Sequence, residues 1–164
     1  MDVREVSRGE IKLVGLEVVG RRQELSQRVP MAWLELTRGL EAIRHKVDPA
    51  LFYGVSPESD HLHGGQSGVY SYWVATEVSA FESVPATMTT LLVPAQRYAV
   101  TTCKGGAEQI EPTYIGLAQW LAASGSKTRA DAYAFELYDV RRQRPTPPYE
   151  RFDYDIYRPL ESVA

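Results

Sequence analysis

The sequence predicts an α+β domain in which two helices lie on one side of an antiparallel sheet. Three observations lead to this prediction. Several short runs are rich in β-branched and aromatic residues, as strands are. Only two segments carry apolar residues at the three- and four-residue spacing of a helix. The order strand, helix, strand, strand occurs once in each half of the 164 residues.

In the first half, the run IKLVGLEVVG (11–20) predicts the opening strand. Residues 29–47 follow as the first helix, with an apolar stripe and with Pro30 in its first turn. Short strands are predicted at 51–57 and 69–78, separated by a loop at 59–68. The stripe consists of Trp33, Leu36, Leu40 and Ile43.

The second half repeats this order. A short connecting strand, TTLLV (89–93), precedes a strand at 95–105 and a helix at 110–125. Two further strands follow at 133–140 and 152–160, on either side of a proline-rich turn. We therefore expect residues 1–164 to form a single domain made of two pseudo-repeats, about 8–80 and 88–161, with a central ligand cleft between them.

The bulk composition excludes several classes of function. Lysine and arginine total 18 and aspartate and glutamate 21, which gives a net charge of −3 without a basic run, so no direct nucleic-acid binding is expected. No apolar run approaches the roughly 20 residues that cross a membrane. The N-terminus lacks an apolar signal core, and Cys103 is the only cysteine, so we expect a cytoplasmic protein. No motif predicts a metal or another cofactor.

A carboxylate lies in the most aromatic strand. In ADAYAFELYDV, alternation assigns Phe135 and Leu137 to the core and leaves Glu136 and Tyr138 on the other face. The same argument, applied to the other strands, predicts which side chains share that face. The candidate ligand-binding residues are Glu136, Tyr138, Tyr157, Trp73, Tyr53 and Glu77.

Such a set suits a flat, lipophilic cation. Aromatic rings attract cations through their quadrupole, by about 0.5–2 kcal/mol for each good contact. A partly buried carboxylate is costly when alone, and a bound cation offsets that cost. The alternative is that Glu136 lies at a sheet edge or on a wet face, where glutamate is common, and binds nothing.

Five short motifs follow one another along the second half of the chain. Their residues are Val93, Pro94, Ala95 and Tyr98; Lys104 and Gly105; Thr113, Tyr114, Trp120 and Leu121; Glu136 and Tyr138; and Ile156, Tyr157 and Pro159. In this order they resemble the GyrI-like family of small-molecule-binding, or effector-binding, domains of bacterial transcription activators, although Gln96 stands where the family has glycine.

The resemblance implies the duplicated fold, a cleft between the halves, and cationic aromatic ligands that meet Glu136. With the domain starting near residue 10, it implies the stand-alone form rather than a complete DNA-binding activator. Three functions follow. The first is binding, sensing or sequestration of lipophilic compounds. The second is hydrolysis of strained-ring natural products, in which Glu136 activates water and Tyr157 assists. The third is interaction with a protein partner, such as a regulator or gyrase.

Overall fold

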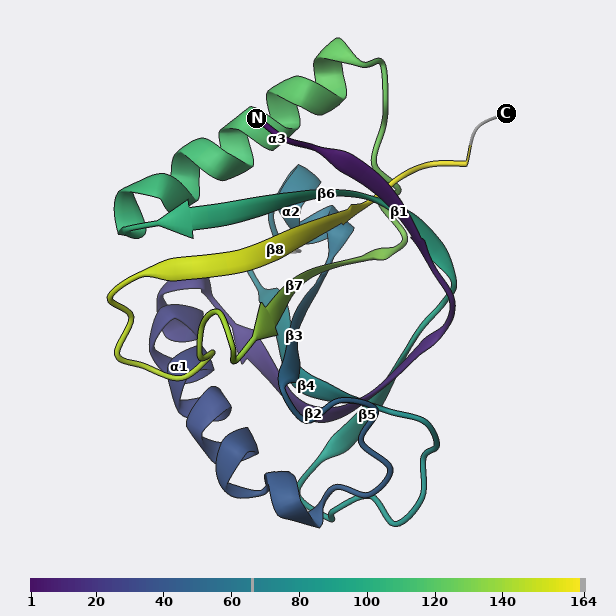
Figure 1. The fold of residues 1–164 in the computed structure, drawn as a ribbon, viewed down its shortest axis with the longest axis vertical. Helices are drawn as coiled ribbons and strands as arrows, with labels where there is room; N and C mark the ends of the chain where they lie inside the picture. The colour runs from purple at the N-terminus through teal and green to yellow at the C-terminus, as the bar shows by residue number, and fades with distance from the viewer. Residues whose placement is uncertain (66, 163–164) are drawn as a thin grey trace.

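The computed structural model describes residues 1–65 and 67–162. Its strands form one eight-stranded antiparallel sheet in the order β1-β6-β8-β7-β3-β4-β2-β5 (Figure 1). The strands are β1 (Arg4–Arg8), β2 (Ile11–Gly20), β3 (Leu51–Pro57), β4 (Tyr70–Val78), β5 (Thr89–Val93), β6 (Gln96–Gly105), β7 (Tyr133–Asp139) and β8 (Phe152–Pro159). The helices are α1 (Arg22–Arg38), α2 (Glu58–His63) and α3 (Ile110–Ala123).

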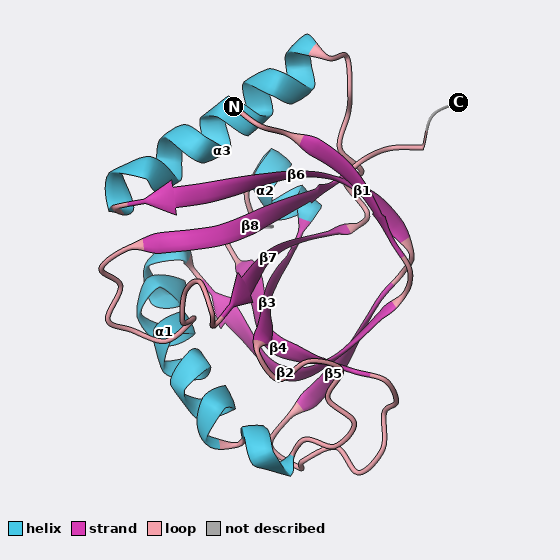
Figure 2. Ribbon diagram, in the orientation of Figure 1, coloured by secondary structure: helices cyan, strands magenta, loops and turns pink. Residues whose placement is uncertain are grey.

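The predicted fold class is confirmed. The sheet is strongly curled, and α1 and α3 both lie outside the curl, over different strands (Figure 2). The order strand, helix, strand, strand occurs as β2-α1-β3-β4 and again as β6-α3-β7-β8. The two strands at the middle of the sheet, β7 and β3, are therefore the ones that lie under the gap between the helices.

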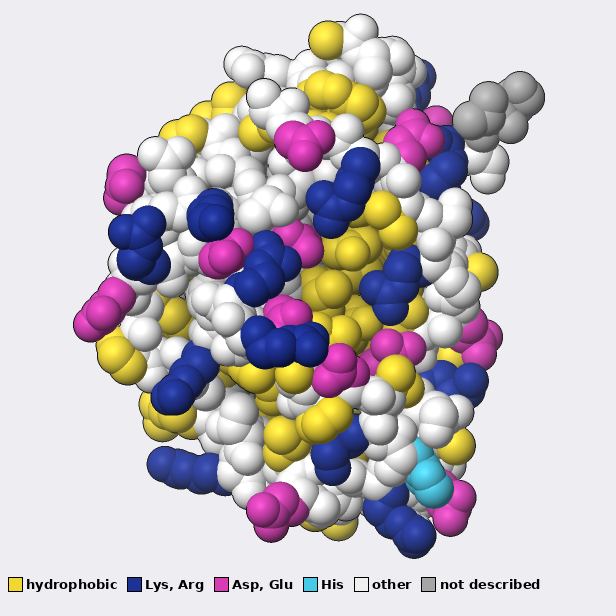
Figure 3. Space-filling view, viewed as in Figure 1, with side chains coloured by type: hydrophobic (Ala, Val, Ile, Leu, Met, Phe, Trp, Pro, Cys, Tyr) yellow, Lys and Arg dark blue, Asp and Glu magenta, His cyan; other side chains and the backbone are white. Residues whose placement is uncertain are grey.

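Both faces of the sheet are buried, which gives three apolar clusters. On the outer face, α1 packs through Trp33 and Leu36 on β2 and β4, and α3 packs through Leu117 and Leu121 on β6 and β8. The third cluster fills the inside of the curl and contains no helix residue. Figure 3 shows apolar side chains inside the curl, with arginine and acidic side chains around them.

The first helix begins and ends earlier than the sequence predicted: it covers Arg22–Arg38 rather than residues 29–47, and Leu40 and Ile43 lie beyond its end. The backbone N–H of Arg21 donates to Oε1 of Glu24 at 3.0 Å, which fixes the start of α1, and Pro30 lies inside the helix. Proline is disfavoured there because it removes one hydrogen bond of the helix. The tertiary contact of Trp33 and Leu36 with the sheet outweighs that cost.

Two elements were not predicted from the sequence. Strand β1 pairs with β6 at one edge of the sheet, and α2 occupies part of the segment predicted as a loop. The other strands lie within one residue of the predicted ranges. Among the described residues, no helix is long and apolar enough to cross a membrane.

Candidate functional site

A cavity of about 400 Å³ opens on the outer face of the sheet, between the two long helices. Its volume is within the range of sites that hold drug-sized molecules. Its walls come from α1, β3, α2, β4, α3, β7 and β8. The lining residues are Arg22, Leu25, Ser56, Asp60, His61, Tyr70, Ser71, Tyr72, Tyr114, Ala134, Phe135, Glu136, Ile156, Tyr157 and Arg158.

Glu136 is half-buried in this wall and accepts two hydrogen bonds from phenols. Tyr72 Oη donates to Glu136 Oε1 at 2.6 Å, and Tyr114 Oη donates to Glu136 Oε2 at 2.5 Å. Burial, and then the negative charge of Glu136, raise the pKa of Tyr72 and of Tyr114 well above the ordinary value. Both phenols therefore remain protonated donors at neutral pH, and each carboxylate oxygen is held in place by one of them.

The position of Tyr72 depends on a glycine in the neighbouring strand. Gly54 of β3 lies opposite Glu136 of β7 on one side and Val74 of β4 on the other. A Cβ atom at Gly54 would lie 1.8 Å from Tyr72 Oη, so any larger residue would displace the phenol. Gly54 thus provides the space in which Tyr72 reaches Glu136.

The opposite end of the cavity contains a buried ion pair. Arg158 donates to Glu58 from Nε at 2.8 Å and from Nη2 at 2.5 Å, and Glu58 is fully buried. Because Glu58 neutralises Arg158, this end does not present an unpaired positive charge from β8 to a ligand. Nearby, Ser56 Oγ lies 2.8 Å from His61 Nε2. Burial, and then Arg158, lower the pKa of His61, so this imidazole is neutral at pH 7.

The rim of the cavity is more polar. Arg22 of α1 stacks over the ring of Tyr70 at 5.2 Å and donates to its hydroxyl at 3.3 Å. Asp60 of α2 accepts a hydrogen bond from the backbone N–H of Ser71 at 3.1 Å. The cavity therefore has charges of both signs at its rim and Glu136 deeper between the helices.

The structure brings only part of the predicted set together. Glu136 lines the cavity, and Tyr138 lies on the same face of β7. Trp73 and Tyr53 lie in the cluster inside the curl, on the opposite face. Glu77 also lies there, accepting a hydrogen bond from Tyr53 Oη at 3.1 Å.

Tyr157 occupies an intermediate place. It contributes to the cavity wall, but its ring stacks on Phe135 inside the curl, with centroids 4.3 Å apart. The prediction that Trp73, Tyr53, Glu77 and Tyr157 share the face of Glu136 is therefore wrong. Asp155 pairs with Leu137 and so also lies on the face opposite to Glu136.

Strand register explains the difference. Glu136 pairs with Ile156 of β8 and with Gly54 of β3, and Gly54 pairs with Val74 of β4. Side chains alternate along a strand, so the neighbours of Glu136 on its face include Tyr72 rather than Trp73. A shift of one residue in the assumed register exchanges the two faces of a strand.

The two phenols that contact Glu136, Tyr72 and Tyr114, are not among the ligand-binding residues predicted from the sequence. Two signals were present. Tyr114 belongs to a family motif, and Gly54 is a residue without a side chain inside an otherwise bulky strand.

Comparison with known proteins places the whole chain in one family. The model of the GyrI-like small molecule binding domain matches residues 1–161. A transcriptional regulator, BrlR of Pseudomonas aeruginosa, is 29% identical over 160 residues, which cover 98% of this chain and 56% of the regulator. The chain thus spans little more than half the length of that relative.

Solved structures share the fold at low sequence identity. SAV2435 bound to tetraphenylphosphonium aligns with a TM-score of 0.71 at 16% identity, covering 99% of this chain and 95% of SAV2435. The C-terminal domain of EcmrR gives 0.70 at 14% identity, covering 99% and 98%. A hydrolase encoded by lin2189 of Listeria innocua gives 0.54 at 11% identity, covering 97% and 91%.

Proposed function

The chain belongs to the GyrI-like family of small-molecule-binding domains, and we propose that its ligands are lipophilic aromatic cations held at Glu136. The observation that supports this proposal most directly is the set of residues that line the cavity. A half-buried carboxylate lies in its wall between two phenols, and aromatic and apolar side chains make up much of the rest. A cation there would gain both the attraction of the carboxylate and contacts with aromatic rings.

Two observations support this proposal. Glu136 has no lysine, arginine or histidine within ion-pairing distance among the described residues, so a cationic ligand would be its first counter-charge. Arg158, which also lines the cavity, is already neutralised by Glu58. SAV2435, which shares the fold, was solved with tetraphenylphosphonium, a cation of this kind.

Binding of tetraphenylphosphonium, followed by calorimetry, tests the proposal. Tetraphenylborate is the matched control because it has nearly the same shape and the opposite charge. We expect the phosphonium to bind and the borate to bind at least tenfold more weakly. Glu136→Gln should remove most of the preference, since a carboxylate–cation contact near a protein surface is worth several kcal/mol before desolvation. Glu77→Gln, on the other face, should retain it.

Equal binding of the two ions, or an unchanged preference in Glu136→Gln, would contradict the proposal. The hydrolase alternative uses the same carboxylate and is tested on the same variants. A cyclopropane-bearing alkylating compound would then be converted by the wild type, and Glu136→Gln would lose that turnover. Tyr157, the second residue of that alternative, has its ring stacked on Phe135, so Tyr157→Phe should leave any turnover unchanged.

A further inference from the structure

A second cavity lies on the other side of Glu136. It has a volume of about 280 Å³ and shares Leu25, Tyr72 and Glu136 with the first cavity. We call the cavity that Arg158 lines the first cavity and this one the second cavity. Glu136 is thus a common wall of two neighbouring spaces rather than the end of one.

The second cavity is as aromatic as the first but lacks the charged residues Arg22, Asp60 and Arg158 of the first. Its walls include Trp33, Tyr138, Tyr149, Phe152 and Tyr154. The ring centroids of Trp33 and Tyr138 lie 5.6 Å apart, and those of Tyr138 and Tyr154 lie 5.0 Å apart. Among the described residues of the lining, Glu136 is the one acidic or basic side chain, because the other polar members are serine, glutamine and phenols. Burial, and then Glu136, raise the pKa of Tyr138 and of Tyr154, so both phenols stay neutral.

The outer wall of this cavity is the segment between β7 and β8. Gln143, Pro145 and Tyr149 of this segment face Leu25, Val29 and Trp33 of α1 across the space; these residues all line it. In Figure 1 the segment, yellow-green, lies against the first half of α1. Internal bonds shape it, since Tyr149 Oη donates to the Pro145 carbonyl at 2.8 Å.

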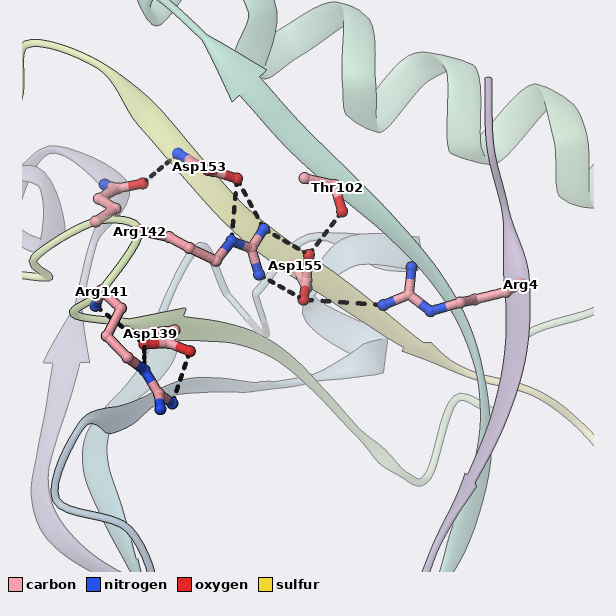
Figure 4. Close-up of polar contacts among 8 residues, drawn as sticks. Arg4, Thr102, Asp139, Arg141, Arg142, Asp153 and Asp155 are labelled. Atoms are coloured by element: carbon pink, nitrogen blue, oxygen red, sulfur yellow. Dashed lines mark hydrogen bonds and ion pairs between the residues drawn. The ribbon is translucent and has the colours of Figure 1, made fainter.

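Arg142 fastens this segment to β8 without lining the cavity. Its guanidinium donates to Asp153 Oδ1 at 2.8 and 3.1 Å and to the two oxygens of Asp155 at 3.0 Å each (Figure 4). The next residue, Gln143, accepts a hydrogen bond from the backbone N–H of Asp153 at 2.7 Å. By contrast, among the described residues Arg141 bonds only Asp139 and Asp48, and no hydrogen bond or ion pair joins its side chain to β8.

We propose that the second cavity takes an aromatic arm attached to the cation that Glu136 binds, and that Arg142 positions the wall against which this arm packs. The inference rests on the proposed function and adds a ligand class to it. The preferred compounds are elongated: a lipophilic cation in the first cavity, joined by a short flexible linker to an aryl group. An arm that enters the second cavity exchanges water for ring faces and is enclosed by α1, β8 and the segment between β7 and β8.

Two phosphonium ions test this inference. Propyltriphenylphosphonium and (3-phenylpropyl)triphenylphosphonium carry the same cation and differ by one terminal phenyl group. Burial of that ring should tighten binding by the wild type about tenfold. Arg142→Gln should reduce the ratio of the two affinities to below about threefold, because the wall is no longer held. Arg141→Gln is the matched control on the same segment and should keep the full ratio.

A second variant, in the wall itself, tests the second cavity even if Arg142→Gln does not fold. Tyr149→Ala truncates a partly exposed ring of the second cavity, and we expect it to reduce the ratio as well. Equal affinities in the wild type overturn the second cavity as an aryl site. A full ratio in Tyr149→Ala does the same, and a full ratio in a folded Arg142→Gln overturns the role of Arg142. If neither phosphonium binds, the proposed function itself fails, which is a distinct outcome.

Discussion

Neutralising Glu58, the partner of the cavity residue Arg158, should strongly destabilise the protein. Glu58 begins α2, is fully buried, and forms a bidentate pair with Arg158 across 100 residues of sequence. In Glu58→Gln, the guanidinium of Arg158 stays buried without a counter-charge. Removing one partner of a buried pair costs about 3–5 kcal/mol. For a domain of this size, that corresponds to a fall of about 10 °C in the unfolding midpoint.

The assay is urea unfolding followed by tryptophan fluorescence, with two comparisons. Glu5→Gln breaks the exposed pair with Arg97, whose N···O distance is also short at 2.7 Å. This change should cost less than about 1 kcal/mol, because solvent screens both charges. The double variant Glu58→Leu, Arg158→Met removes both buried charges and should recover most of the loss.

The same substitution has a functional consequence. Arg158 lines the first cavity, so Glu58→Gln leaves an unpaired positive charge there. Tetraphenylphosphonium binding should weaken, and binding by the double variant should return toward that of the wild type. A cost below 1 kcal/mol for Glu58→Gln, or unchanged affinity in the folded variant, would refute the view that Glu58 neutralises Arg158 in the cavity wall.

Three further predictions follow from the described contacts. Gly54→Ala should weaken phosphonium binding more than Tyr72→Phe does. Tyr72→Phe loses only the hydrogen bond to Glu136, whereas the new methyl group of Gly54→Ala also displaces the whole ring. Calorimetric titration of both variants with tetraphenylphosphonium measures the difference. Tyr53→Phe removes a hydrogen bond to Glu77 on the other face, so it should cost about 1 kcal/mol in urea unfolding and leave ligand affinity unchanged. Burial raises the pKa of Asp155, but hydrogen bonds from Arg142 and Thr102 outweigh this effect and lower the pKa. The ionised Asp155 therefore stabilises the fold above about pH 4, and this stabilisation should be lost as the pH falls further. Acid unfolding of Asp155→Asn should show a weaker pH dependence than that of the wild type.

Strand positions could be predicted because their signals are local. Alternation, β-branched residues and turn residues delimit β2, β3, β5 and β8 within a few neighbouring positions. The missed elements have long-range support. The residues of β1, REVSR, are mostly exposed and form a strand only by pairing with β6. The first residue of α2, Glu58, is tied to Arg158 of β8.

The start of α1 shows how packing outweighs local preference. Proline favours the first turn of a helix, and this preference moved the predicted start toward Pro30. The helix in fact begins at Arg22, and its earlier turns place Leu25 in the walls of both cavities. These turns therefore contribute to the site as well as to the fold. They were missed because Pro30 was taken to mark the first turn of the helix.

The faces of the strands were harder to predict than the strands, and the reason is physical. When one face of a sheet is solvated, the polar residues of each strand identify it. Here the curled sheet buries apolar side chains on both faces, so alternation divides each strand into two sets without saying which sets meet. Pairing across β7, β3 and β4 decides that Glu136 meets Tyr72 rather than Trp73. Gly54 is the one sequence signal of this pairing. Glycine weakens a strand and often marks a close approach of another group. Here that group is the phenol of Tyr72, which donates a hydrogen bond to Glu136.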